Sequence, residues 1–517
     1  MNRHGQLIGC LALGFVASCV VAVGEPPIDA QVEPGAAHAI THLLDDRHHV
    51  ATGGAGVIGL VAMVLAWAWL IRLARQNSLR LRWPVAAAVA WTLPVVIGGP
   101  VLSSDVYAYG AIGQLVQHGL NPYTNGPSAL HSGAFLHAMD PKWAHAHTPY
   151  GPLALLFLHA AVWLGHGAFG PTMAILRTSI AVAAVVAVLA AVAAASPSKK
   201  ALTAAVVAAS PLVVVGLVGS AHIDAFAVAL AALAALAWRA RRVVPAVVLA
   251  SLAAAVKAPF AVLVVALIVA AVWGAPHGRL RRGGGLVTVA FVAYLVPALA
   301  IGRPLQLVSA LSTPYERLDL DSPPAALAWL LRKLLEGLGL PGGGVLQAVI
   351  FAVSEAIGAV LVVVFVRRSR NANPSVCAGY ALAAAALCSP VMHAWYLAWA
   401  LVLVVPVLWR RDILPWLVGV CGFVMPMEAA HPDLPGVLVA TAGFGFAAAA
   451  AIFGALVVRA SVPRITPRRS TRTPRPGRVV LQRPFVPVLD RPGLIVLFSL
   501  LPLRKVAGLP VMKAREK

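Results

Sequence analysis

The chain has 517 residues, of which 60% are hydrophobic and 11% charged, and its mean hydropathy is +0.85. Soluble domains carry about 25% charged residues, so this composition excludes a soluble globular domain and indicates a membrane protein with many apolar spans. The net charge of +22 does not indicate a nucleic-acid partner, because the Lys and Arg residues occur in short runs between apolar stretches, as in cytoplasmic loops.

Fifteen apolar segments follow one another along the chain, from 6–24 to 435–458. The basic connections between them, assigned to the cytoplasm, fit strict alternation except between Arg82 and Lys199. That interval holds three apolar segments, although an even number of crossings is required because both basic runs are cytoplasmic. The segment 150–167 opens at a proline-rich turn and carries His159 and His166, so it is the one predicted not to cross but to form an interfacial helix on the outer face. The expected fold is an all-α polytopic bundle of about 14 transmembrane helices, with both termini in the cytoplasm.

Two regions are expected along the chain. Residues 1–460 form the membrane domain, with a large outer loop at about 101–171, and residues 461–517 form a basic, Arg- and Pro-rich cytoplasmic tail whose composition is typical of disorder. The cysteines lie in apolar stretches without CxxC spacing, which indicates neither a disulfide framework nor a zinc site.

The first polar cluster lies at the outer end of the third span, in Ser103-Ser104-Asp105-Val106-Tyr107-Ala108-Tyr109. A carboxylate with aromatic residues two and four positions later suits a general base beside a sugar-binding platform, because aromatic faces stack on sugar C–H surfaces. The alternative is an N-cap Asp followed by tyrosines of the interfacial belt. The pattern favours neither interpretation over the other.

Two further clusters lie at predicted outward turns. His222 and Asp224 can bind a phosphate or a sugar hydroxyl, although capping is the simpler interpretation of Asp224 alone. Lys257, the only Lys within the apolar segments, can neutralise a lipid phosphate, and its alternative is snorkelling to the headgroups. Function is favoured for Lys257, because its charge is predicted to lie outside, where positive charge is uncommon.

The fourth cluster is Ser389-Pro390-Val391-Met392-His393-Ala394-Trp395-Tyr396, again at an outward turn. A proline-broken helix end that exposes a histidine and two aromatic residues suits contact with a ligand. Polar residues beside membrane segments are costly and usually functional. Because all four clusters are predicted on the outer face, the sequence indicates one extracytoplasmic site.

These residues, in this order, resemble the polyprenol-phosphomannose-dependent α-1,6-mannosyltransferases of actinobacterial lipoglycan synthesis, integral-membrane glycosyltransferases of the GT-C class. The matching stretches are SSDVYAYGAIGQLVQHGLNPYTNGP, HTPYGPL, SAHIDA, VKAPF and SPVMHAWYLAW. The resemblance implies a GT-C-like bundle whose large first outer loop carries the catalytic Asp and interfacial helices. HIDA departs from the family's His-Asn-Asp version, because Ile223 stands in place of the Asn.

The implied reaction is inverting transfer of mannose from polyprenyl-phosphate-mannose to a lipid-anchored mannan, by α-1,6 elongation, at the outer face of a bacterial plasma membrane. Asp105 is implied as the general base, and neither a metal nor another cofactor is expected. The candidate donor or phosphate-binding residues are Lys257, His222, Asp224, His393 and Arg177. The candidate sugar- or acceptor-binding residues are Tyr107, Tyr109, Tyr150, Trp395 and Tyr396.

Two other classes fit the same composition. A polytopic transporter or lipid-linked sugar flippase would bind its solute with outer-face charges, but such sites usually lie near the bilayer midplane, often between repeated halves. Here the polar residues gather at the ends of the segments, and the sequence shows no repeat. A non-catalytic envelope scaffold would tolerate loss of Asp105.

Overall fold

The structure is a computed structural model that describes residues 3–24, 49–76, 79–302, 322–407, 413–429 and 452. Every regular element in these ranges is a helix, which agrees with the predicted all-α class. The predicted tail, 461–517, lies outside the described residues. In chain order the elements are α1 (Arg3–Gly24), α3 (His49–Gln76), α4 (Arg82–Ile97), α5 (Asp105–Gln117), η1 (Pro127–Leu130), α6 (Ala134–Ala138), η2 (Pro141–Trp143), α7 (Pro152–Leu164), α8 (Phe169–Ala194), η3 (Pro197–Lys199), α9 (Lys200–Val207), η4 (Leu212–Gly219), α10 (Asp224–Arg239), α11 (Val243–Val256), η5 (Ala258–Phe260), α12 (Ala261–Trp273), α13 (Arg279–Ala300), α15 (Pro323–Gly337), α16 (Gly343–Arg368), α17 (Pro374–Cys388), η7 (Ala394–Tyr396), α18 (Leu397–Val404) and α19 (Ile413–Ala429).

Long apolar helices make this a membrane protein. Five helices in the described ranges are long and apolar enough to cross a bilayer, or six if α9 and η4 form one bent span. Several other apolar helices have only 10–17 residues, and a straight crossing takes roughly 20. The number of crossings predicted from the sequence, about 14, therefore stays a prediction, as does the side of the membrane that each end faces.

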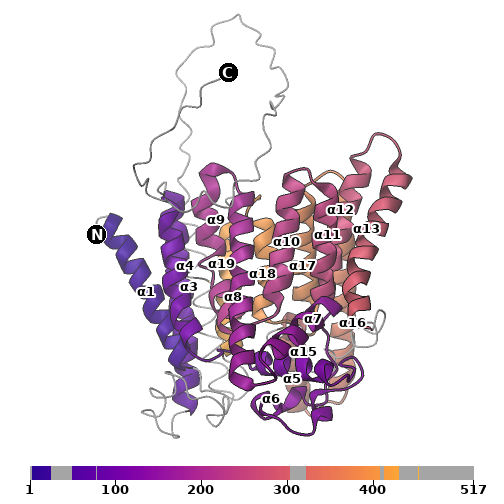
Figure 1. Cartoon of the computed structure of the whole chain (residues 1–517). Helices are drawn as coiled ribbons and strands as arrows, with labels where there is room; N and C mark the ends of the chain where they lie inside the picture. Colours follow the sequence, from indigo (N-terminus) through magenta and orange to yellow (C-terminus); the bar gives the residue numbers. More distant parts are fainter. Residues whose placement is uncertain are drawn as a thin grey trace, which may run out of the picture. The chain divides into compact units, whose positions relative to one another are not determined.

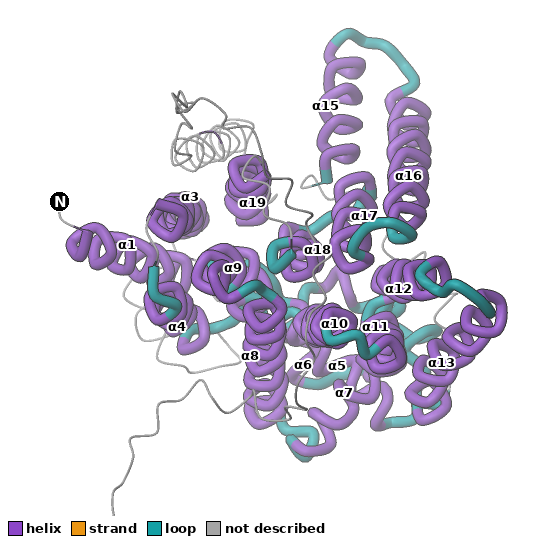
Figure 2. The backbone as a smooth tube through the Cα atoms, turned by 90° about the horizontal axis from the view of Figure 1, so that it is seen from above, coloured by secondary structure: helices purple, strands orange, loops and turns teal. Residues whose placement is uncertain are grey.

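The helices run between two ends of the bundle. Figure 1 shows α5, α6 and α7 gathered at one end, here called the α5 end, and the α10–α11 and α12–α13 connections at the other, here called the far end. From above, α10, α11 and α18 lie near the centre, while α1, α3 and α4 lie at one side and the α15–α16 pair at another (Figure 2). The central helices thus connect the two ends directly.

A break in one span shapes the α5 end. The helix pair 197–207 and 212–219 bends by 56° at a break that contains Ser210-Pro211, where proline cannot continue an α-helix. The second part, η4, is a π-helix, and its last residue, Gly219, accepts a hydrogen bond from the Val101 backbone N–H at 3.1 Å. A tight turn follows, with Ala221 in the left-handed region at φ 53°. The turn presents residues 220–223 to the start of α5.

Helix α7 is the segment predicted to be interfacial. Its 13 residues extend about 20 Å at 1.5 Å per residue, short of a hydrocarbon core of about 30 Å, so α7 cannot cross a bilayer alone. The loop before it approaches the end of α11 closely: the Gly151 N–H donates to the Val256 carbonyl at 2.9 Å, and a Cβ on Gly151 would overlap the Ala255 carbonyl. Glycine is needed there, and the contact brings Tyr150 beside Lys257.

Candidate active site

Asp105 is the first residue of α5, and its side chain is held by an aromatic residue of the following loop. The Trp143 indole N–H donates to Asp105 Oδ1 at 3.0 Å. The cap position belongs to Ser104, and the Asp105 backbone N–H donates to Ser103 Oγ at 3.2 Å. The capping interpretation of Asp105 is therefore wrong. Its side chain is 14% exposed, so the carboxylate remains accessible.

His222 lies beside this carboxylate and is fully buried. Its Nδ1 is 3.7 Å from Asp105 Oδ2 and 3.4 Å from the Tyr109 hydroxyl, which lies 3.1 Å from the Tyr150 hydroxyl. Burial lowers the pKa of His222 well below its usual value, and the charges of His393 and Lys257 lower it further. The ring is therefore neutral near pH 7, and its contact with Asp105 is no ion pair.

The pKa of Asp105 is set by opposing influences. Burial raises it above the usual value, while the positive charges of His393, Lys142 and Lys257 and the Trp143 hydrogen bond lower it. Because burial dominates, Asp105 is a stronger base than an exposed carboxylate. A strengthened carboxylate base is the property that general-base catalysis requires.

Asp224 and Lys257 form a second, buried pair. Lys257 Nζ is 3.5 Å from Asp224 Oδ2, and Asp224 Oδ1 accepts a hydrogen bond from the Trp399 indole N–H at 3.0 Å. Lys257 Nζ also lies 4.6 Å from the Tyr150 ring centroid and 5.1 Å from that of Tyr396. The capping interpretation of Asp224 and the snorkelling interpretation of Lys257 are both wrong, because the two charges pair with each other inside the protein.

A stack of three rings joins His222 to the last helix of the site. Trp395 lies between His222 and His393, with centroid separations of 3.5 and 4.3 Å. His393 Nδ1 is 3.5 Å from Glu428 Oε1, and Glu428 Oε2 accepts the Ala394 backbone N–H at 2.9 Å. Glu428 thereby holds the turn that carries the stack.

The structure brings most of the predicted site residues together, with two qualifications. Tyr107 stacks on Phe169, with centroids 5.8 Å apart, and is only 9% exposed. Arg177 donates to the carbonyl oxygens of Val95 and Val96 at the end of α4. Its role toward a donor phosphate, like the other assigned roles, stays a prediction.

Three residues of the cluster were missed by the sequence analysis: Trp143, Trp399 and Glu428. The two tryptophans look like members of the interfacial aromatic belt in a linear sequence. Glu428 offered a better signal, because it is one of only 18 acidic residues in the chain and lies at the end of an apolar segment. Across the described ranges, no three His, Cys, Asp or Glu side chains are grouped so as to hold a metal ion. Metal independence stays a prediction.

A carboxylate of raised pKa beside a buried histidine and aromatic rings, at one end of an apolar helical bundle, suits a membrane-embedded group-transfer enzyme. The comparisons with known proteins agree with this class. The model of the alpha-(1->6)-mannopyranosyltransferase N-terminal domain matches residues 11–275, and that of the MptB C-terminal domain matches residues 326–465. The chain belongs to this mannosyltransferase family, and it is a glycosyltransferase.

Curated relatives carry the same description. The chain is 27% identical over 388 residues to alpha-(1->6)-mannopyranosyltransferase A of Mycobacterium tuberculosis, covering 71% of this chain and 73% of the relative. It is 26% identical over 182 residues to the A enzyme of Corynebacterium glutamicum, covering 34% and 36%, and 24% identical over 163 residues to the B enzyme of that organism, covering 29% and 26%. No solved structure matches the chain. Membership of this family implies a sugar donor and an acceptor. It does not support the transporter or the scaffold alternative.

Proposed function

We propose that this chain transfers mannose, with inversion, from a polyprenyl-phosphate-mannose donor to a hydroxyl of a lipid-anchored mannan, forming an α-1,6 linkage outside the plasma membrane. The observation that carries the proposal is Asp105, an accessible carboxylate of raised pKa beside the neutral His222. A strengthened base at the end of an apolar bundle is suited to removing a proton from an acceptor hydroxyl. The α-1,6 linkage is taken from the names of the relatives.

In this proposal, Asp105 accepts the proton as the acceptor oxygen attacks the anomeric carbon and the bond to the phosphate oxygen breaks. Two buried ring nitrogens, His222 Nε2 and Trp395 Nε1, have no hydrogen-bond partner among the described residues. Buried polar groups are nearly always hydrogen-bonded, so a sugar hydroxyl or a phosphate oxygen is their expected partner.

The leaving phosphate needs positive charge, and Lys257 is the principal candidate. Its pairing with Asp224 at 3.5 Å is longer than an ordinary charged hydrogen bond of about 2.7–2.9 Å. The lysine can therefore turn toward a phosphate oxygen while it keeps Asp224 and the faces of Tyr150 and Tyr396 as neighbours. Asp224 fixes the position of the ammonium group.

An apolar groove supports a lipid-linked donor over a nucleotide sugar. It has a volume of about 710 Å³, lies between α7, α8 and α10, and has only Thr178 and Ser179 as polar lining residues. Its lining includes Ile223, next to Asp224, and Val256, next to Lys257. A polyprenyl chain in this groove would have its phosphate at Lys257. Ile223, which replaces the family's Asn, would then contact the lipid rather than the sugar.

The test offers membranes with the expressed chain three donors: polyprenyl-phosphate-mannose, polyprenyl-phosphate-glucose and a nucleotide-mannose. Only the first should give a product, and linkage analysis should find α-1,6-mannose. Leu230→Trp, which fills the groove, should raise KM for a long-chain donor but not for a ten-carbon analogue. Leu189→Trp, on an exposed part of α8 outside the groove, is the matched control. Equal use of the nucleotide-mannose would overturn the proposal.

A further inference from the structure

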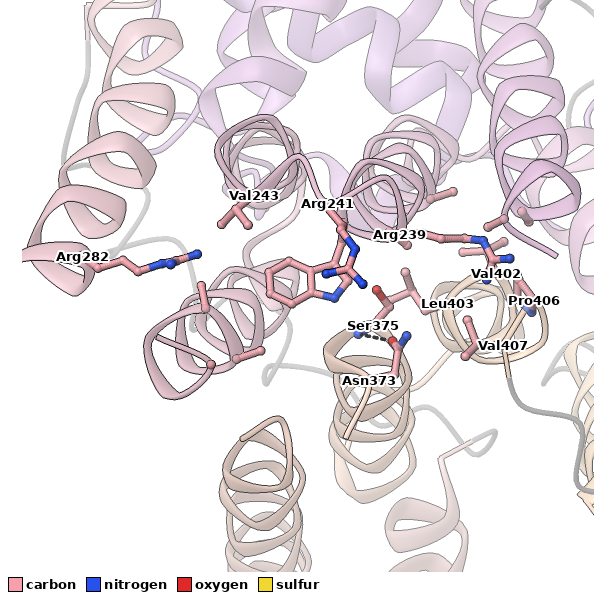
Figure 3. Close-up of a pocket in the computed structure, with 18 residues that line it drawn as sticks. Arg239, Arg241, Val243, Arg282, Asn373, Ser375, Val402, Leu403, Pro406 and Val407 are labelled. Atoms are coloured by element: carbon pink, nitrogen blue, oxygen red, sulfur yellow. Dashed lines mark hydrogen bonds between the residues drawn. The ribbon is translucent and has the colours of Figure 1, made fainter. Parts of the chain in front are cut away.

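A second pocket lies at the far end of the helices that carry the site. Asp224 begins α10 and Arg239 ends it, about 22 Å away at 1.5 Å per residue. Similarly, Lys257 follows the last residue of α11, whereas Val243 begins that helix and lines the pocket. The pocket has a volume of about 500 Å³ and is lined by residues of α8, α10, α11, α12, α13, α17 and α18 (Figure 3).

Three arginines line this pocket: Arg239, Arg241 and Arg282. Figure 3 shows Arg241 between the other two: the Arg282 side chain extends toward it, and the Arg239 side chain extends away from it, toward Val402 and Pro406. No acidic residue lines the pocket, and within the described ranges none of the three guanidinium groups has an ion pair or a side-chain hydrogen bond. All three arginines are exposed, and their long side chains can turn toward an anion in the pocket, which would gain charged hydrogen bonds.

The backbone at Arg241 belongs to the cap that ends α10. Its φ of 60° is the left-handed conformation of this cap, in which the Arg241 N–H donates to the Trp238 carbonyl and the Arg242 N–H to the Ala237 carbonyl, both at 2.9 Å. Glycine is the usual residue at such a position, so an arginine there is strained. The adjacent start of α11 has no side-chain cap, so its free N–H groups add positive potential on the same side.

Much of the pocket's lining is apolar. Small residues of three helices contribute to it, here called the alanine floor: Ala191, Ala194, Ala232, Ala235, Ala270 and Ala271. A ligand that matches both parts has an anionic head and an apolar body. Basic pockets between membrane helices bind phosphate headgroups of anionic lipids on this principle. We propose that this pocket binds the phosphate of an anionic membrane lipid, whose acyl chain follows the alanine floor.

The proposal does not depend on the reaction, so its test uses binding. The full chain, purified in a neutral detergent, is unfolded by heat with increasing phosphatidylglycerol or phosphatidylcholine of identical acyl chains. Phosphatidylglycerol should raise Tm with saturation, and phosphatidylcholine should not. Replacing Arg239, Arg241 and Arg282 together by Gln should weaken binding, so that the half-saturating concentration of phosphatidylglycerol rises at least tenfold.

The matched control replaces Arg281, Arg367 and Arg368 by Gln. This variant loses the same charge, but its three exposed arginines do not line the pocket. The control should bind like the wild type. Equal weakening in the two triple variants would mean general surface attraction and would overturn the proposal. Stabilisation by inorganic phosphate equal to that by the lipid would overturn the lipid assignment in favour of a free anion.

A single substitution distinguishes loss of lipid binding from misfolding. Arg241→Gly relieves the left-handed strain, so its Tm without lipid should equal or exceed that of the wild type. Its Tm increase with phosphatidylglycerol should nevertheless shrink. An undiminished increase in this variant would contradict a pocket built around Arg241.

Discussion

Replacement of Asp105 by Asn tests the proposed base with little structural disturbance. Asn keeps the size of the side chain and an oxygen that can accept the Trp143 indole hydrogen bond, now 3.0 Å long. The nearest His222 nitrogen is 3.7 Å away, beyond hydrogen-bonding distance, so no strong contact is lost. The change in unfolding free energy should stay below about 1 kcal/mol.

The catalytic effect should be far larger than this. Asn cannot accept the proton of the attacking hydroxyl, and general-base catalysis contributes roughly a hundredfold to ten-thousandfold. At about 1.36 kcal/mol for each factor of ten, the activation free energy should rise by about 3–5.5 kcal/mol. The assay measures transfer of radiolabelled mannose from polyprenyl-phosphate-mannose in membranes with equal amounts of each variant.

Asp140→Asn is the matched control, because Asp140 belongs to the same loop region but is 32% exposed and paired with Lys142 at 2.8 Å. It should retain most of the activity. Turnover by Asp105→Asn within about threefold of the wild type, against the hundredfold loss expected of a general base, would falsify the assignment. The base would then be sought at Asp224, the other carboxylate at a helix start in the cluster.

Three further predictions follow from the same contacts. Trp143→Phe removes a hydrogen bond that lowers the pKa of Asp105, the proposed base, so that pKa should rise. Because the base acts deprotonated, the acid limb of kcat/KM against pH should move to higher pH than in the wild type; an unmoved limb would contradict the role of this bond. Lys257→Met should raise the apparent KM for the donor by roughly tenfold to a hundredfold, the value of a charged hydrogen bond of about 1.5–3 kcal/mol, with the acceptor KM unchanged; equal effects on both substrates would exclude a donor-specific role. A cysteine at Ser132, an exposed loop position, should react with a membrane-impermeant thiol reagent in intact cells, and one at Asn371 should not, with the wild-type chain as background; the reverse pattern would invert the topology.

The sequence was sufficient to predict the helical class and most, though not all, of the residues that gather at the α5 end. Charged and polar residues are so scarce in this chain that each one beside an apolar segment is informative. Asp105, His222, Lys257 and His393 could therefore be identified without a structure. Their order along the chain also carried the family resemblance that the comparisons support.

The pairing of these residues could not be predicted, because it depends on contacts between distant segments. Nothing near Lys257 in the sequence indicates that Asp224 is its partner, since they meet only when α10 and α11 pack side by side. Solvent exposure could not be predicted from the sequence either. Ser369, which the basic-run pattern suggests as a probe of the cytoplasmic side, is 1% exposed, whereas Asn371 is exposed. The latter is therefore the better position for labelling.

The hydrogen bond from Ala394 to Glu428 also affects how the protein is made. The turn that carries His393 is made 428 − 393 = 35 positions before Glu428, so at about 5–20 residues per second it waits roughly 2–7 s for this partner. By then the nascent chain already holds Asp105 and Lys257. The cluster is therefore complete only once α19 has been made, and a chain interrupted before α19 would lack the anchor of this turn.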